Sequence, residues 1–262
     1  MEPQNILVDA RHGRMLCNKM DTYIGRSIEL YGEFSEGEAD LFRQLLRPGQ
    51  WVVEAGANIG SLTLPIAKYV GSQGRVFAFE PQRIVHQTLC ANMALNNIAH
   101  VNCRWEGLSD KQGTMVVPSL NYSKPNNFGG LFLMDEGNGE RVPVVTIDSL
   151  NLPTLHAIKA DVEGMEHQVI RGGIETIKRC RPFLYVENDR RDKSKPLLEL
   201  LLSLDYSLYW HFPLLYSAEN FRRNSENIFP GIISVNVLGI HNSYQTNISG
   251  LRRIESADDW RE

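Results

Sequence analysis

The chain is poor in cysteine. It has four cysteines in 262 residues, Cys17, Cys90, Cys103 and Cys180, and no two of them form a C-x-x-C pair. Zinc knuckles and disulfide frameworks both need cysteines at short, regular spacings, so neither is expected. Isolated thiols are typical of a reducing compartment, which predicts a cytoplasmic protein.

The chain also lacks long apolar runs and an excess of positive charge. No stretch approaches the roughly 20 apolar residues of a membrane-spanning helix, and the start, Met1 to Gln4, has neither the basic nor the apolar region of a signal peptide. We therefore expect no stable membrane insertion. The net charge is -4, so nucleic acid is not an expected partner.

From Trp51 onward, short apolar runs alternate with helical patterns. Strands are expected at about 51–55, 75–80, 101–105, 155–160, 182–186, 206–211 and 232–240, and helices at about 61–70, 82–96, 164–180 and 194–203. This order predicts an α/β fold with a doubly wound sheet and helices on both faces. Residues 114–118 and 141–147 interrupt the alternation and predict an inserted antiparallel β-hairpin with a long loop.

Three segments are expected along the chain: an N-terminal arm and helix (1–48), a central domain (49–243) and a C-terminal tail (244–262). In the arm, residues 23–31 are expected to form a short strand or an irregular segment. Ser35 and Glu38 have the spacing of a capping box, which predicts a helix from Ala39 to Leu46.

The central motif is the glycine-rich stretch Glu54-Ala-Gly-Ala-Asn-Ile-Gly60, between a strand and a helix. Glycines allow a tight turn and the close approach of a ligand. Glu80 ends the next strand, at the distance where an acid contacts a ribose hydroxyl in nucleoside-binding folds. The stretch therefore predicts a nucleoside-binding crevice, and the alternative is a purely structural glycine turn.

The acid at the head of the turn narrows the choice of nucleoside. A dinucleotide-binding protein would show G-x-G-x-x-G, and Glu54 would repel a pyrophosphate. A carboxylate suits a ligand with a cationic centre, such as the ammonium group of S-adenosylmethionine. We expect its adenine base near the turn at 106–110, covered by Leu108 after Gly107 and bonded by Ser109 or a backbone group; the alternative is a plain loop.

Asp161 is the leading candidate for a catalytic base. It follows the strand that ends at Ala160, over the same crevice, and Lys159 lies one alternation away as its expected ion-pair partner. The alternative is that Asp161 or Glu163 caps the following helix.

Candidate acceptor-binding residues lie in the arm and in two long loops. They are Tyr31, Glu33 and Glu36 in the arm, Asn127 in the loop 121–130, Asn188 after the strand at 182–186, and His211 after the strand at 206–211. Long irregular loops in a compact domain are often functional. The seven histidines include no H-E-x-x-H pattern, so no zinc site is expected.

On these motifs the chain resembles class I S-adenosylmethionine-dependent methyltransferases of the FkbM family. The residues that carry the resemblance are Tyr23 to Ser27, Gly32 to Glu38, Glu54 to Gly60, Phe79 to Pro81, Ile158 to Glu166 and Val186 to Asp189. The resemblance implies a seven-stranded Rossmann-like sheet whose last strand is antiparallel. It also implies that the methionine end lies on Glu54, Gly56, Asn58 and Gly60, and the ribose on Glu80 beside Pro81, with Asp161 over the same site.

The family resemblance further implies methyl transfer to a hydroxyl of a sugar, glycolipid or secondary metabolite, so that the partner is a small-molecule or glycan acceptor. Methylation of a nitrogen or a carboxylate, a non-catalytic cofactor-binding subunit and a nicotinamide-dependent oxidoreductase remain alternatives. The arm could also pack on a second copy of the chain in a homo-oligomer.

A metal-assisted reaction is a further possibility. Asp161, Glu187 and Asn188 end neighbouring strands and supply oxygen ligands, which suits Mg²⁺. The pattern is similar to that of metal-dependent catechol-type O-methyltransferases. The alternative is that Glu187, as a catalytic residue, and Asn188 bond the hydroxyls of the substrate directly.

Overall fold

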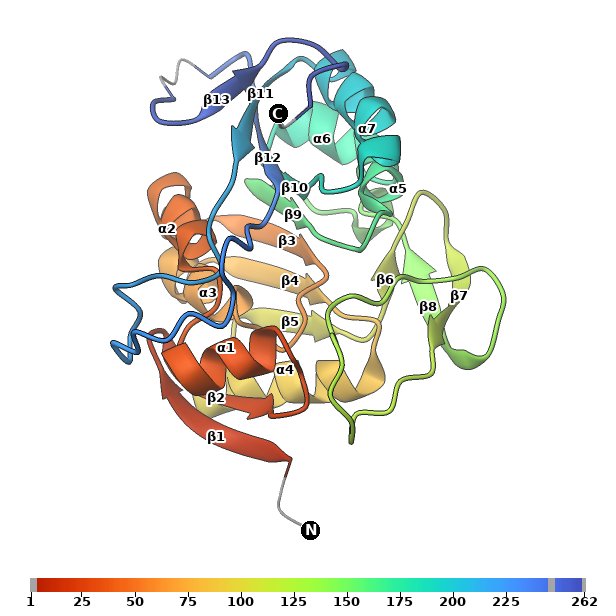
Figure 1. Cartoon of the computed structure of the whole chain (residues 1–262). Coiled ribbons are helices and arrows are strands. Elements are labelled where there is room, and N and C mark those ends of the chain that lie inside the picture. The colour runs from red at the N-terminus through yellow and green to blue at the C-terminus, as the bar shows by residue number, and fades with distance from the viewer. Residues whose placement is uncertain (1–3, 245–247, 261–262) are drawn as a thin grey trace.

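The computed structural model describes residues 4–244 and 248–260. Its centre is an eight-stranded sheet (Figure 1). In spatial order the strands are β13 (Arg252–Ile254), β11 (Tyr206–His211), β12 (Asn236–His241), β10 (Phe183–Glu187), β9 (Ala157–Ala160), β3 (Trp51–Ala55), β4 (Arg75–Phe79) and β5 (Val101–Arg104). The predicted α/β class is confirmed, and the strand positions differ from the predicted ones by a few residues.

The sheet is parallel from β5 to β10, and β12 runs antiparallel to both of its neighbours. The expected antiparallel last strand is therefore present. The sheet differs from the expected seven-stranded one in the C-terminal tail, where β13 pairs with β11 and adds an eighth strand.

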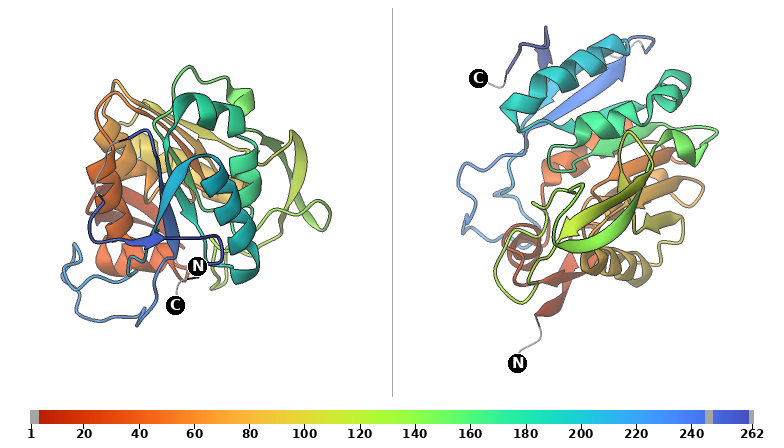
Figure 2. Two further views of the ribbon diagram at one scale, coloured as in Figure 1. Left: turned by 90° about the horizontal axis from the view of Figure 1, so that it is seen from above. Right: turned by 90° about the vertical axis from the view of Figure 1, so that its right-hand side faces the viewer.

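Helices cover both faces of the sheet (Figures 1 and 2). One face carries α1 (Ile24–Tyr31), α2 (Glu36–Leu45), α3 (Thr63–Val70) and α4 (Arg83–Leu95), and the other carries α5 (Glu166–Arg171), α6 (Ile174–Cys180) and α7 (Arg191–Ser203). A short 3-10 helix, η1, spans Asp148–Leu150. Within the described residues, no helix is both long and apolar enough to cross a bilayer.

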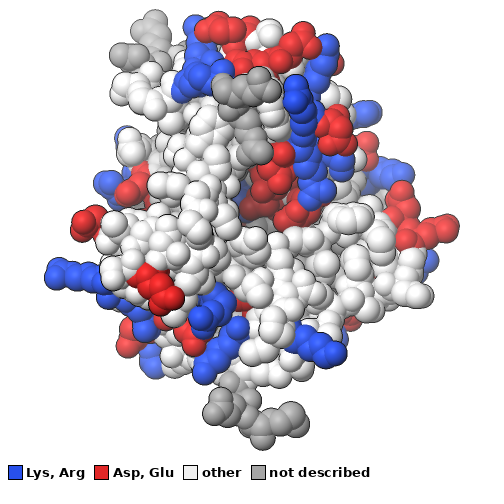
Figure 3. Space-filling view, in the orientation of Figure 1, with Lys and Arg blue, Asp and Glu red and all other residues white. Residues whose placement is uncertain are grey.

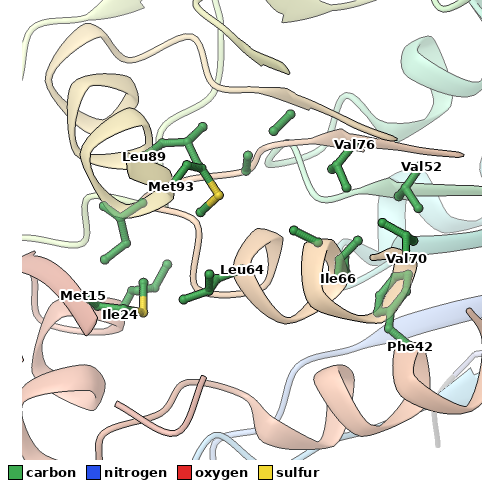
Figure 4. Packing of buried hydrophobic residues seen from close by; sticks show 14 of the residues in the cluster. Met15, Ile24, Phe42, Val52, Leu64, Ile66, Val70, Val76, Leu89 and Met93 are labelled. Atoms are coloured by element: carbon green, nitrogen blue, oxygen red, sulfur yellow. The ribbon is translucent and has the colours of Figure 1, made fainter. Parts of the chain in front are cut away.

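The alternation of side chains along each strand divides the core in two. Val52 belongs to the cluster under α1 to α4, whereas its neighbour Val53 belongs to the cluster under α5 to α7. Figure 4 shows the first cluster, in which Ile66 of α3 faces Val76 of the sheet and Leu64 lies toward Leu89 and Met93 of α4. This packing covers one face of the parallel strands, whose register is set by their backbone pairing.

The N-terminal arm differs from the expectation. It begins with the hairpin of β1 (Asn5–Ala10) and β2 (Gly13–Asn18), and residues 24–31 form helix α1, not a strand or an irregular segment. Ile24, Ile28 and Tyr31 are buried on one face of α1, so packing decides its conformation.

The start of α2 also differs from the expected capping box. The helix begins at Glu36, three residues before the expected start, and Ser35 has a left-handed backbone with φ 47°. The Ser35 hydroxyl donates to the Glu38 carboxylate at 2.7 Å and caps no helix N–H. This contact turns Glu38 toward the interior instead of leaving it as a cap.

The predicted inserted hairpin is present as β7 (Gly113–Pro118) and β8 (Gly139–Val145), which pair antiparallel. A short strand, β6 (Gly107–Leu108), pairs parallel to β8 and completes a three-stranded sheet beside the main one (Figure 1). The loop between β7 and β8, residues 119–138, extends from this small sheet toward α1.

Candidate active site

A cavity of about 340 Å³ lies at the carboxyl ends of β3, β4, β9 and β10. Figure 3 shows acidic side chains gathered near the centre of this face, beside Lys and Arg side chains. The predicted site residues that line the cavity are Glu54, Gly56, Asn58, Glu80, Pro81, Gly107, Leu108, Asn127, Lys159, Asp161 and Glu187. Ligands of open α/β sheets bind at this edge, so the cavity has the expected place.

The glycine turn after β3 is held against two neighbouring strands. The N–H groups of Gly56 and Ala57 both donate to the Phe79 carbonyl, at 3.0 and 2.9 Å. Gly56 has φ 74°, and a Cβ on it would lie 1.8 Å from the Asp161 carbonyl oxygen. Only glycine allows this approach, which brings the turn and the Asp161 loop together.

Gly60 has a different role from the predicted one. It lies outside the cavity lining, and a Cβ on it would approach Leu89 and Met93 of α4 to 2.8 and 3.0 Å. Its small size therefore allows α4 to pack close to the turn, not a ligand to lie against it.

Glu54 is a completely buried carboxylate that faces the cavity. The buried Thr63 hydroxyl stands beside this carboxylate and lowers its pKa, but no hydrogen bond of ordinary geometry joins Glu54 to Thr63 or to another described residue. Burial raises the pKa of Glu54 to about 7, and the charge of Lys159 opposes that rise. An unpaired buried carboxylate is costly unless a cationic group approaches it, so Glu54 fits a ligand ammonium group.

Glu80 and Asn58 connect the turn to the end of β4. The Asn58 N–H donates to one oxygen of Glu80 at 2.9 Å, and the Gln82 N–H donates to the other at 2.8 Å. Burial raises the pKa of Glu80 to about 7. Each oxygen keeps a free lone pair, so the carboxylate is able to accept hydrogen bonds from the two hydroxyls of a ribose.

At the predicted adenine end, Gly107 and Leu108 line the cavity. Ser109 does not, because its N–H donates to Val145 and continues the pairing of β6 with β8. Leu131 and Leu133 of the 119–138 loop complete this wall. The three leucines offer an apolar surface that suits the face of a base, and Glu106 is the charged residue beside them.

Lys159 and Asp161 lie at the end of β9. The Lys159 ammonium donates to the Gly56 carbonyl at 3.0 Å and to Asp161 at 3.2 Å. Burial lowers the pKa of Lys159, but Asp161, Glu54 and Glu38 together raise it above its usual value, so the side chain stays charged. A charged Lys159 is not a base, and it orients Asp161, whose side chain is 40% exposed.

Two further carboxylates stand beside Asp161. Oxygen atoms of Asp161, Glu163 and Glu187 lie within 4.8 Å of one another. Burial and the negative charge of Asp161 raise the pKa of Glu163 to about 7 and that of Glu187 well above its usual value. Arg190 pairs with Glu163 at 2.5 Å, whereas Glu187 Oε2 is buried and makes no hydrogen bond within the described structure.

Five of the predicted acceptor residues lie outside the cavity. The Tyr31 hydroxyl donates to the Glu226 carbonyl, Glu33 pairs with Arg11, Glu36 bonds His12, Asn188 donates to Ser194, and His211 bonds the Tyr185 hydroxyl. Each side chain is used to hold the structure. Asn188 therefore lies away from the predicted metal ligands Asp161 and Glu187, and the third carboxylate beside these two is that of Glu163.

Sequence reasoning missed Glu38 and Gln82, both buried and both lining the cavity. Glu38 had the spacing of a capping residue, which concealed its inward position. Gln82 follows Glu80-Pro81 and begins α4, so it gave no separate signal.

We expect ligand affinity to depend on pH. The raised pKa values of Glu54 and Glu80 favour the folded state at low pH, and their contribution is lost as pH rises from about 4 through 7. A cationic ligand requires the ionised form of Glu54. The affinity for S-adenosylhomocysteine should therefore be roughly tenfold weaker at pH 6 than at pH 8, because most of Glu54 is neutral at pH 6.

Calorimetric titration at the two pH values, in buffers of different ionisation enthalpy, measures both the affinity and the protons released. The Glu54→Gln variant should bind more weakly at pH 8 and lose its share of the pH dependence. An affinity that stays constant from pH 6 to pH 8 would contradict the role given to Glu54.

Comparisons with known proteins identify the family of this chain. A family model described as the methyltransferase FkbM domain matches residues 54–208. Methyltransferase 1 of Beauveria bassiana is 28% identical over 47% of this chain and 57% of its own length. Methyltransferase sdnD of Sordaria araneosa is 28% identical over 58% of this chain and 71% of its own length. The chain thus spans little more than half the length of the first relative.

Among solved structures, the methyltransferase FkbM from Methylobacillus flagellatus KT superposes with a TM-score of 0.50 and 17% identity. The match covers 78% of this chain and 50% of that one, and it supports the Rossmann-like fold. Methyltransferases of this class imply S-adenosylmethionine as the methyl donor. Because the family match covers more than half of the residues, from Glu54 at the glycine turn to beyond Glu187, the chain belongs to the FkbM family of methyltransferases.

Proposed function

We propose that this chain transfers a methyl group from S-adenosylmethionine to a hydroxyl of a small-molecule or glycan acceptor, with Asp161 as the general base. The observation that carries the proposal is the Lys159–Asp161 pair at 3.2 Å, in one cavity with Glu54, Asn58 and Glu80. A sugar, a glycolipid or a secondary metabolite would each supply such a hydroxyl.

The spacing of the strands supports this arrangement. Glu80 follows β4 and Asp161 follows β9, and only β3 lies between these two strands. At roughly 4.8 Å per strand, the two carboxylates end strands roughly 10 Å apart. A nucleoside held at Glu80 with its amino-acid end at Glu54 would bring its reactive centre toward Asp161.

The bound cofactor supplies a methyl group on a sulfonium, which is already an activated leaving group. The protein then has to align the acceptor oxygen and remove its proton. Lys159 holds Asp161 in place, and the partial exposure of Asp161 leaves its carboxylate open to an acceptor. Asp161 is therefore the group we expect to take the proton.

Replacing Glu80 with Ala tests the cofactor site. The change removes the acceptor of two ribose hydroxyls and leaves the N–H groups of Asn58 and Gln82 without a partner. Hydrogen bonds to charged groups are worth about 1.5–3 kcal/mol each, so the Kd for S-adenosylhomocysteine should rise at least about 100-fold. Isothermal titration measures this directly.

Glu140→Ala is the matched control, because Glu140 forms an exposed ion pair with Arg83 outside the cavity. Its Kd should stay within about twofold of wild type, since exposed pairs contribute little. Binding in the Glu80→Ala variant as tight as in wild type would contradict the proposed position of the ribose. A wild type that binds NAD instead would identify an oxidoreductase.

A divalent cation is the alternative means of activating the acceptor. The three carboxylates of Asp161, Glu163 and Glu187 offer oxygen ligands that suit Mg²⁺. We favour the metal-free reaction because Lys159 and Arg190 already compensate the charges of Asp161 and Glu163.

The metal-free reaction predicts that turnover is insensitive to chelation. After treatment with EDTA, the rate of S-adenosylhomocysteine formation with a hydroxylated acceptor should stay within about twofold of the untreated rate. Loss of the activity with EDTA and its recovery with Mg²⁺ would instead favour the three-carboxylate metal site.

A further inference from the structure

Gln82 links the predicted ribose carboxylate to the wall of the cavity. It is a buried residue directly before α4, and its side chain makes no cap to that helix. Its backbone N–H donates to Glu80 at 2.8 Å. Its side chain extends away from Glu80, toward the loop 119–138.

The side chain of Gln82 holds this loop at two points. Its amide nitrogen donates to the Phe128 carbonyl at 2.7 Å, and its amide oxygen accepts a hydrogen bond from the Tyr122 hydroxyl at 3.0 Å. Tyr122 and Phe128 pack edge to face, with ring centroids 5.0 Å apart. Gln82 therefore fixes both members of the aromatic pair that closes this part of the loop.

The segment held by Gln82 forms part of the cavity wall. Asn127 and Gly129 line the cavity directly, and Leu131 and Leu133 follow them. Residues 119–130 belong to no helix or strand, so contacts with other segments of the chain decide their position. Figures 1 and 2 show the loop extending from β7 toward the junction of β2 and α1.

A second anchor lies at that junction and does not involve Glu80. The N–H of Thr22 donates to the Asn126 carbonyl at 2.9 Å, the N–H of Asn126 donates to the Met20 carbonyl at 2.9 Å, and Asn18 donates to the Tyr122 carbonyl at 3.3 Å. Of the two anchors, the Gln82 anchor is the one bonded to Glu80.

We infer that Gln82 is a positioning residue that couples occupancy of the cofactor site to the closed position of the loop 119–131. This inference rests on the proposed function, because it takes Glu80 as the ribose carboxylate. A ligand bonded to Glu80 fixes the backbone of residues 80–82 and so keeps the Gln82 amide directed at Tyr122 and Phe128. By linkage, the closed loop favours the bound cofactor to the same extent.

Hydrogen exchange on the full chain, with and without saturating S-adenosylhomocysteine, tests the coupling. In wild type, the ligand should slow amide exchange in peptides covering 119–131 by at least about fivefold, the lower end of typical coupling between sites. In Gln82→Ala the backbone bond to Glu80 remains, so the ligand should still bind, with a Kd raised by about the coupling factor, roughly fivefold. The slowing in 119–131 should disappear.

Two further variants separate coupling from simple loosening of the loop. Tyr122→Phe removes one of the two side-chain bonds without leaving a cavity and should give an intermediate loss of the ligand effect. Asn18→Ala weakens the other anchor and should raise exchange equally with and without ligand, so that their ratio stays at the wild-type value. If Gln82 had only a structural role, Gln82→Ala would likewise raise exchange at 119–131 equally in the free and the ligand-bound protein.

The outcomes distinguish the two ideas. Ligand binding with slowed exchange at 54–60 but no change at 119–131 in wild type would overturn the coupling and leave the proposed function intact. Slowing at 119–131 that persists in Gln82→Ala would also overturn it, because direct contact of the ligand with the loop would then be responsible. A wild type that does not bind S-adenosylhomocysteine would overturn both.

Discussion

Replacing Asp161 with Asn should lower kcat for methyl transfer by about 10³-fold and leave cofactor binding nearly unchanged. General bases typically contribute 10²–10⁴-fold. An amide of the same shape cannot take the proton from the hydroxyl that is methylated. Asparagine keeps the size of the side chain, and the Lys159 ammonium keeps its bond to the Gly56 carbonyl. The measurement is the rate of S-adenosylhomocysteine formation with a hydroxylated acceptor found by screening.

Two controls make the Asp161 result interpretable. The Kd of the variant for S-adenosylhomocysteine should stay within about threefold of wild type, which would show that the site is intact. Asp40→Asn changes an exposed acid on α2 that pairs with Arg43, and its kcat should equal that of wild type.

Retained turnover in Asp161→Asn would contradict the role of Asp161 as a base. It would mean that the hydroxyl proton leaves without the help of this carboxylate. Faster turnover with a nitrogen or carboxylate acceptor would favour that alternative. The complete absence of turnover in wild type with intact cofactor binding would instead favour a non-catalytic cofactor-binding subunit.

Replacing Gly56 with Ala should lower the free energy of unfolding by about 3–5 kcal/mol and abolish activity. Part of the loss is the left-handed backbone, which costs an alanine about 1–2 kcal/mol. The larger part is steric, because the new Cβ would lie 1.8 Å from the Asp161 carbonyl oxygen, and a backbone group cannot move aside as a flexible side chain can. If the glycine turn at Gly56 moved away from the loop that contains Asp161, Asp161 would also be displaced from the cavity.

Gly49 offers a matched control for the steric part. It has φ 88°, and a Cβ on it would meet no atom within 4 Å. Gly49→Ala should therefore show only the backbone cost of about 1–2 kcal/mol. Urea unfolding of both variants measures the difference, and equal losses would show that the contact between Gly56 and Asp161 is not tight.

The sequence predicted those parts of the molecule that depend on local pattern. Each of the parallel strands β3, β4, β9 and β10 is a short apolar run followed directly by a polar residue or a glycine turn. Because parallel strands end at one edge of a sheet, Glu54, Glu80, Asp161 and Glu187 could be placed over one cavity without coordinates. The inserted hairpin of β7 and β8 followed from the same kind of pattern.

Strand alternation explains one incorrect expectation. Glu187 and Asn188 are adjacent, so their side chains leave an extended backbone on opposite sides. Glu187 faces the cavity, whereas Asn188 bonds Ser194 at the start of α7. Glu163 takes the place expected for Asn188. The left-handed backbone of Glu163, φ 58°, in the turn after β9 brings its side chain there.

The remaining site features were decided by contacts between segments far apart in the chain. Gln82 holds Phe128, 46 residues away, and the Tyr31 hydroxyl bonds the carbonyl of Glu226, 195 residues away. Residues 24–31 form a helix because Ile24, Ile28 and Tyr31 stand at helical spacing and pack into the core, a pattern that the expected strand overlooked. By itself the sequence determined the sheet, the glycine turn and the acids at its edge, since these follow from local periodicity and strand ends. Only the tertiary structure decided which polar side chains face the cavity and which are used in holding it, because a buried polar group takes whatever partner the folded chain brings within reach.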